Sequence, residues 1–205
     1  MVAQILLPSL AANWAESNIS KYGDDVQISI EAFPAIKLLF HRADEVKMTA
    51  KALTPDSGQS ILGQLKNTER FSATVGTLNA GRAPLQNVHI EKSPSGAFQL
   101  LANLTRKDVS AALPPGVTLQ DRQAATNEIP VTIGSALLGK GIDSVLSVET
   151  DGGAVVIRVR LPGALGLVSS LQPIQVFEDP YLTAERITMP PTANGWRFSL
   201  TGRVK

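Results

Sequence analysis

The side chains that most often carry catalysis or bind metals are scarce in this sequence, and their spacing fits no ligand pattern. The two histidines, His41 and His89, form no His-x-x-x-His pair, which is the spacing that places two zinc ligands on one helix face. The acidic pairs Asp24–Asp25 and Asp44–Glu45 lie beside expected strands, where solvated turns account for them. The chain has no Cys, which excludes disulfides, thiolate metal sites and a cysteine nucleophile. We expect neither an enzyme nor a metal or cofactor site.

One glycine-rich segment comes close to a phosphate-binding loop. Residues Gly134 to Gly141 read Gly-Ser-Ala-Leu-Leu-Gly-Lys-Gly, and Gly141 stands where such a loop has the Ser or Thr that binds Mg²⁺. The segment that follows, Ile142 to Val148, alternates like a strand, whereas a phosphate-binding loop opens a helix. We therefore expect a connection between two strands, with Gly where the backbone needs unusual φ values.

Composition narrows the class of protein further. The 205 residues include 19 basic and 18 acidic side chains, for a net charge of +1, so the sequence gives no electrostatic reason to expect a nucleic-acid partner. Hydrophobic residues make up 43% and aromatic residues 5%, which indicates an aliphatic core large enough for one domain. We expect a single domain over residues 1–205.

The first part of that domain should be a helix. Over residues 1–20, Leu6, Leu10 and Trp14 recur every four positions and fall on one helical stripe. No Lys or Arg precedes this apolar run, as it would in a signal peptide, and the run is too short to span a bilayer.

Residues 24–204 predict a sheet with short helices. Apolar and polar side chains alternate in segments that begin near Val26, Val46, Phe71, Val88, Ile129, Val155 and Trp196. Strands with one apolar and one polar face are typical of antiparallel sheets. Short helices are expected over 35–40, over 57–65, and after Thr105, where Thr105 and Asp108 have capping-box spacing.

Two connections between strands are apolar where surface loops are normally polar. One follows Phe33-Pro34 and the other follows Leu161-Pro162, and each Pro removes a donor from the preceding strand. Two interpretations stay open here. The connections either fold back onto the core as short helices, or they line an apolar pocket or touch a membrane.

Three segments together resemble one protein family. They are residues 25–46, which contain Val-Gln-Ile-Ser-Ile-Glu-Ala-Phe-Pro-Ala-Ile-Lys-Leu-Leu, then Lys107 to Gly116, and Leu171 to Pro180. In order and spacing they resemble the LmeA-like phospholipid-binding proteins of actinobacterial cell envelopes, from about Leu10 to Gly202.

The resemblance implies a fold, a location and a function. The implied fold is α+β: a strongly curved antiparallel sheet, half-barrel or tubular, that wraps on the N-terminal helix and encloses an apolar groove. The implied function is non-enzymatic binding or transfer of a phospholipid or other acyl lipid at a membrane surface. Members of the family are exported to the cell envelope or periplasm, and many carry an N-terminal signal or anchor, which we expect to be absent from residues 1–205. The family offers no catalytic residues to carry over.

The candidate site residues come from the two aliphatic connections and the basic residues beside them. Burial of each CH₂ of an acyl chain contributes about 0.8 kcal/mol, so aliphatic walls are sufficient for binding. The expected acyl contacts are Phe33, Pro34, Ile36, Leu38, Leu39, Phe40, Leu161, Leu165, Leu167 and Val168. The expected headgroup contacts are Lys37, Arg42, Arg158 and Arg160. Two alternatives remain: a structural or interaction module of the envelope with a closed core and no ligand, and an enzyme that acts on envelope lipids.

Overall fold

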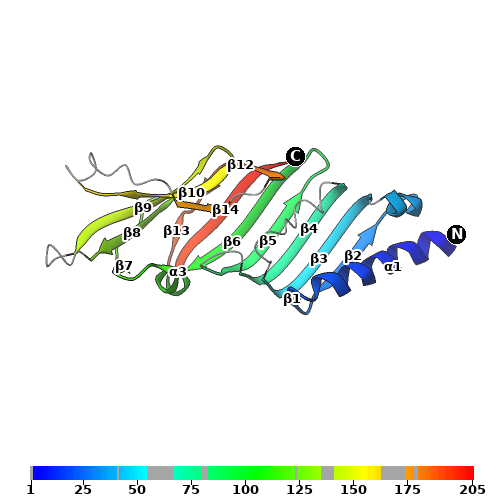
Figure 1. Ribbon diagram of the computed structural model, residues 1–205, viewed down its shortest axis with the longest axis horizontal. Coiled ribbons are helices and arrows are strands. Elements are labelled where there is room, and N and C mark those ends of the chain that lie inside the picture. The colour runs from blue at the N-terminus through cyan, green and yellow to red at the C-terminus, as the bar shows by residue number, and fades with distance from the viewer. Residues whose placement is uncertain are drawn as a thin grey trace.

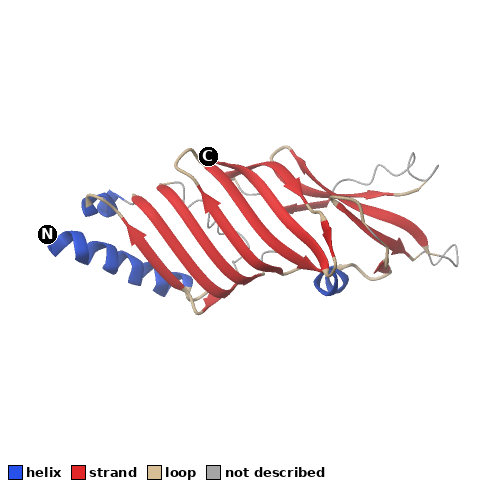
Figure 2. Cartoon of the chain, turned by 180° about the vertical axis from the view of Figure 1, so that it is seen from behind, coloured by secondary structure: helices blue, strands red, loops and turns tan. Residues whose placement is uncertain are grey.

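The fold is α+β, and most of the chain is in strands (Figures 1 and 2). The computed structural model describes residues 2–40, 42–54, 67–79, 83–122, 124–134, 141–162, 174–177 and 180–205. In these ranges an N-terminal helix precedes a nine-stranded mixed sheet and a five-stranded antiparallel sheet. The two sheets lie toward opposite ends of an elongated molecule (Figure 1).

The N-terminal helix is present as expected and lies along one edge of the larger sheet. Helix α1 (Val2–Ile19) packs beside strand β2 (Gln27–Glu31) and the 3₁₀ helix η1 (Ala35–Phe40). The Glu16 carboxylate accepts a hydrogen bond from the outward N–H of Ile28, at 2.7 Å. A helix that covers an edge strand in this way prevents its free backbone groups from pairing with another chain. The stripe that contains Leu10 and Trp14 faces outward, and these side chains are 63% and 72% exposed.

The larger sheet is mixed, and its strands follow a single path. Strands β1 (Gly23–Asp24) and β2 both pair with β3 (Ala43–Leu53), along the same edge of that strand. From β3 the sheet continues in the order β4 (Thr68–Leu78), β5 (Leu85–Lys92), β6 (Ala97–Thr105) and β14 (Gly195–Val204). Strands β12 (Leu182–Thr188) and β13 (Pro191–Thr192) pair with the far side of β14.

Strands β3 and β4 are parallel, with Val46 opposite Phe71, and the other pairs of this sheet are antiparallel. The expectation of a purely antiparallel sheet is therefore wrong. Residues 54–67 separate the two strands, which is long enough for the crossover that a parallel pair needs. The predicted helix over 57–65 lies outside the described residues.

The smaller sheet is antiparallel, in the order β11-β10-β9-β8-β7. Its strands are β7 (Val117–Leu119), β8 (Glu128–Ile133), β9 (Ile142–Asp151), β10 (Ala154–Arg160) and β11 (Ile174–Phe177). Ile133 pairs with Ile142 across β8 and β9, so a strand precedes and a strand follows the glycine-rich segment, as the sequence predicts. Residues 135–140 themselves lie outside the described residues.

Two of the short helices are also where the sequence places them. Helix α3 (Arg106–Ala112) begins at the capping box, where the Thr105 hydroxyl accepts the backbone N–H of Asp108 at 3.1 Å. Helix η1 occupies the predicted range of residues 35–40 as a 3₁₀ helix.

One face of the larger sheet is apolar and the other is polar. Along each strand, residues that pack in the core alternate with exposed polar residues, as in β4, where Phe71, Ala73 and Val75 are buried and Thr74 is exposed. His89 lies on the polar face with its side chain 42% exposed, in agreement with the sequence. The apolar face continues across the sheet through Ile28, Met48, Val88, Phe98, Ala102, Leu200 and Ile187.

The tight curl that the sequence suggested is not present in the described strands. The described strands of the larger sheet run from the edge formed by β1 and β2 to the edge formed by β12 and β13, and these two edges do not pair with each other. Helix α1 lies beside edge strand β2 (Figure 1). The sheet does not wrap around the helix, because the helix packs on its edge.

Candidate functional site

The first group of predicted lipid contacts lies at the turn between β2 and η1. Phe33 is 73% exposed and Pro34 is also exposed, whereas Leu38 is half-buried. Ile36, Leu39 and Phe40 belong to η1, and their side chains lie outside the described residues. A large apolar side chain therefore projects into solvent at the end of β2, next to α1.

Asp44 fixes the backbone of this turn. Its carboxylate accepts the N–H of Phe33 and an N–H of the Lys37 ammonium, both at 2.5 Å. The hydrogen bond from Lys37 and then that from Phe33 lower the pKa of Asp44. The interpretation of Asp44 as a solvated turn residue is therefore wrong, and Lys37, predicted as a headgroup contact, is already paired. Arg42 is exposed, and its N–H donates to the Lys37 carbonyl at 3.1 Å.

The second group lies at the end of β10. Leu161 is half-buried immediately after the strand, while Leu165, Leu167 and Val168 lie outside the described residues. The basic residues of this group, Arg158 and Arg160, are on β10 itself.

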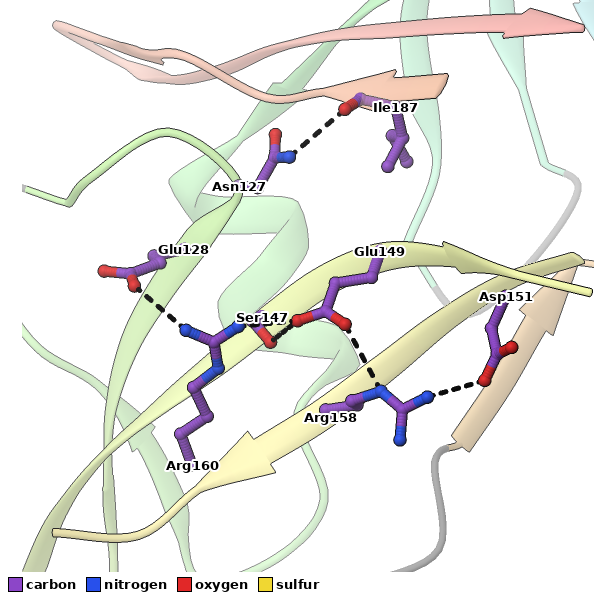
Figure 3. Close-up of polar contacts among 8 residues, drawn as sticks. All are labelled: Asn127, Glu128, Ser147, Glu149, Asp151, Arg158, Arg160 and Ile187. Carbon is purple, nitrogen blue, oxygen red and sulfur yellow. Dashed lines mark hydrogen bonds and ion pairs between the residues drawn. The ribbon is translucent and has the colours of Figure 1, made fainter. Parts of the chain in front are cut away.

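Both arginines are held by carboxylates (Figure 3). Arg158 contacts Glu149 at 3.3 Å and Asp151 at 2.5 Å. Arg160 contacts Glu149 at 2.7 Å and Glu128 at 3.9 Å. The pKa of Glu149 is lowered by its hydrogen bond from Ser147 and by that from Arg160. A phosphate would have to displace these carboxylates before it could bind to either arginine.

The apolar face of the larger sheet contains a cation that sequence reasoning missed. Lys92 follows Val88 and Ile90 in the alternation of β5, and it is 7% exposed. Phe71 of β4 and Phe98 of β6 lie directly opposite it on the two neighbouring strands. The sequence does contain a signal for this placement. Lys92 stands two residues after Ile90, and this spacing puts both side chains on the apolar side of β5.

This position belongs to a row of residues that crosses the whole sheet. The row, here called the Lys92 row, consists of Ile30, Val46, Phe71, Lys92, Phe98, Gly202 and Ala184. Its other members have aliphatic or aromatic side chains or are Gly. Lys92 is thus a single cation in an apolar strip.

The environment of Lys92 disfavours its charge. Its ammonium donates to the carbonyl of Thr68, a residue that is itself buried. Burial lowers the pKa of Lys92, and the charge of Glu69 opposes that shift in part. Lys92 makes no ion pair shorter than 4.0 Å with any side chain in the described parts of the chain.

Two open hollows are lined by described residues. One of about 610 Å³ lies at the end of the larger sheet where β5 ends, and is lined by Phe71, Lys92 and Phe98 together with Glu45, Arg70, Glu91 and Gln99 of the polar face. The other, of about 360 Å³, lies beside Trp196, with Arg106 placed 5.9 Å from the ring centre. Neither hollow is the long apolar groove that the sequence led us to expect.

Comparison of the chain with protein-family models, with curated proteins and with solved structures finds no match. Within the described residues, no helix is both long and apolar enough to cross a membrane. In the same residues, no three His, Asp or Glu side chains gather in a way that could hold a metal ion.

Proposed function

We propose that this protein binds an acyl lipid without chemically converting it, and that it acts at the membrane surface of a bacterial cell envelope. The observation that carries the proposal is the apolar face of the nine-stranded sheet, which extends from Ile28 of β2 to Ile187 of β12. The resemblance of residues 25–46, 107–116 and 171–180 to envelope phospholipid-binding proteins supports it. The paucity of catalytic side chains agrees with a protein that holds a ligand.

The apolar face is long enough for one acyl chain. Strand β5 (Leu85–Lys92) spans about 23 Å, at about 3.3 Å per residue. One leaflet of a bilayer places its acyl chains in about 15 Å of hydrocarbon, which is half the thickness of the bilayer core. At about 0.8 kcal/mol per buried CH₂, ten methylenes contribute about 8 kcal/mol, which corresponds to micromolar binding. In the lipid-bound form we expect the sheet to curve around the chain, as in tubular lipid-binding domains.

The predicted contact residues take different roles in this proposal. Phe33 and Pro34 are exposed beside α1 and would meet the membrane during lipid exchange. Lys37 and Arg42 lie near that turn and would face lipid headgroups there. Arg158 and Arg160 would contact a headgroup only after they exchange their carboxylate partners.

A closed core without ligand is the second candidate, and one observation favours it. Ala73, Val75 and Val88, in the middle of the apolar face, are 0% exposed. In a structural or interaction module the same face would simply be the core. A lipid could enter a closed face only if the segments that cover it move away.

Native mass spectrometry and extraction from vesicles separate the two candidates. Freshly purified protein should carry a lipid mass, and it should remove labelled phosphatidylglycerol from liposomes. With a diazirine-bearing phospholipid, cross-links should map to apolar-face residues such as Ile90 and Leu100. His89 and Gln99, their neighbours on the polar face, serve as internal controls. Protein that is consistently empty, extracts no lipid and gives equal labelling of both faces would favour the closed core.

A further inference from the structure

Three large hydrophobic side chains are exposed at the end of the molecule where the N-terminal helix lies. Leu10 and Trp14 on α1 are 63% and 72% exposed, and Phe33 in the turn after β2 is 73% exposed. Phe33 stands two residues before η1, which packs against α1. Helix α1 and strand β2 lie together at one end of the elongated molecule (Figure 1). Apolar side chains that gather on a surface in this way mark a contact with a partner or a membrane.

The opposite side of α1 is tied to the sheet. Ala15 and Ile19 pack against the hydrophobic core. The Glu16 carboxylate accepts a backbone N–H of β2 at 2.7 Å. The exposure of Leu10 and Trp14 is therefore fixed by the way the helix packs on the sheet.

The outward side of α1 contains no charge beside this stripe. Asn13 and Ser17, its exposed polar neighbours, are both uncharged. From Val2 to Ala15 the sequence contains no Asp, Glu, Lys or Arg. A helix side that faces water normally has charged residues, so this side has a composition suited to surroundings less polar than bulk water.

The size and shape of this surface favour a membrane over a second copy of the chain. The 18 residues of α1 span about 27 Å, and a helix is about 10 Å wide, so the outward side offers about 270 Å². A stable protein interface buries about 800 Å² on each partner. The exposed side chains also project separately, from a helix and from a turn. A bilayer needs no matching shape, because lipids adapt to each inserted side chain.

We propose that the outward side of α1 and the turn at Phe33 form a membrane-docking surface, in which Leu10, Trp14 and Phe33 enter the interfacial region of a phospholipid bilayer. This inference rests on the function proposed above and names the part of the molecule that meets the membrane. Helix α1 lies along the bilayer surface, as interfacial helices do. Trp14 suits this depth, because its ring is apolar and its indole N–H can donate to a lipid oxygen.

The charge of the lipid headgroups should matter little for this docking. Lys21 follows α1 and Arg42 follows η1, and both are exposed, but Asp24, Asp25 and Glu31 are exposed in the same part of the chain. The positive and negative charges therefore nearly cancel. Binding to phosphatidylcholine and phosphatidylglycerol vesicles should differ by less than about fivefold, and about 0.5 M NaCl should change it little.

Tryptophan fluorescence tests the docking on the full-length protein. Phosphatidylcholine vesicles should shift the emission of Trp14 to shorter wavelength, and lipids brominated on the acyl chain should quench it. Trp196 is 2% exposed and donates to a backbone carbonyl of β8, so in Trp14→Phe the remaining emission should neither shift nor be quenched. If the protein sediments with vesicles while Trp14 is unaffected, the contact lies elsewhere and this inference is wrong.

Vesicle sedimentation of two variants measures the contribution of the other side chains. Leu10→Ala and Phe33→Ala should each weaken binding about tenfold, from the apolar surface that no longer enters the lipid. Ile174→Ala is the matched control, because Ile174 is 60% exposed but belongs to the smaller sheet, and its binding should stay within about twofold of the wild type. All three positions are exposed, so the unfolding midpoints should move by less than about 2 °C.

The oligomeric state tests the other possible occupant. Sedimentation velocity without lipid should give a single species whose size does not change with protein concentration. A dimer that forms as the concentration rises and disappears in Leu10→Ala would show that a second copy covers α1, and membrane docking would be overturned.

Docking and lipid binding can fail separately. If vesicles bind the wild type and both variants equally, or bind none of them, the docking surface is refuted, even where the protein still extracts labelled lipid. If vesicles bind through Leu10 and Phe33 but the protein neither carries nor extracts lipid, docking stands and the proposed lipid binding fails.

Discussion

Asn127 joins the two sheets, and its replacement gives a sharp test of the architecture. It lies just before β8 with φ of 65°, a left-handed conformation that Asn tolerates better than other non-Gly residues. Its side-chain amide donates to the Ile187 carbonyl at 3.1 Å (Figure 3). Its side-chain oxygen accepts the backbone N–H of Met189 at 2.6 Å. Met189 is 1% exposed, so water cannot easily replace the lost partner.

The expected loss can be worked out bond by bond. Each side-chain hydrogen bond contributes about 0.5–1.5 kcal/mol, and a left-handed Ala costs about 1 kcal/mol. Asn127→Ala should therefore lower the free energy of unfolding by about 3 kcal/mol, or about 6–12 °C in Tm at about 2–4 °C per kcal/mol. Asn127→Gly loses the same bonds without the backbone strain and should lose about 2 kcal/mol.

The fluorescence of Trp196 provides the assay, because this residue lies where Asn127 links the two sheets. It is 2% exposed, and its indole N–H donates to the Glu128 carbonyl at 3.1 Å. The other tryptophan, Trp14, is exposed, so a Trp14→Phe background leaves fluorescence that reports on the joint alone. Urea unfolding would then measure both variants against this background. If Asn127→Ala costs less than 0.5 kcal/mol, or if Gly is worse than Ala, the inference that Asn127 holds the two sheets together is wrong.

Three further predictions concern single ionic or capping contacts. The pKa of Asp44 is lowered in the fold by Lys37, so its stabilisation is complete above the unfolded pKa of 3.8 and is lost as pH falls through the lower folded value. Asp44→Asn should flatten this acid dependence in urea titrations. The pKa of Lys92 is lowered from 10.5, so the unfolded chain binds more protons between the folded pKa and 10.5. Stability should rise with pH there, and Lys92→Met should remove that rise. Thr105→Ala removes the cap of α3 and should cost about 1 kcal/mol in thermal unfolding, whereas Thr105→Ser should cost much less.

The sequence predicts local structure well here because that structure depends on neighbours along the chain. Alternation located the strands that contain Ile28, Ala73 and Ile129, and the spacing of Thr105 and Asp108 located a helix start. The parallel pairing of β3 with β4 was missed, because alternation shows which face a strand buries and gives no information on the direction of its partner.

The candidate site was harder to predict, because charge compensation depends on residues far apart in sequence. Arg158 and Arg160 look like free cations along the chain, but Glu149 lies across a strand pair from them. Alternation after Ile90 places Lys92 on the apolar side of β5, but the register of β5 with Phe71 and Phe98 is needed to show that it is enclosed. Sequence reasoning therefore took Lys37, Arg158 and Arg160 for available cations, although the fold pairs each of them with a carboxylate.

The arrangement of the sheets also limits what one lipid can touch. The aliphatic connection after Phe33 adjoins β2, at one edge of the larger sheet, while Arg158 and Arg160 belong to β10, which packs near β12 at the opposite edge. Six strand spacings of about 4.8 Å separate β2 from β12, or about 29 Å. One headgroup cannot bridge that distance, so the two predicted cationic groups cannot bind the same phosphate. Each of these two edges would therefore have to contact its lipid headgroup independently of the other.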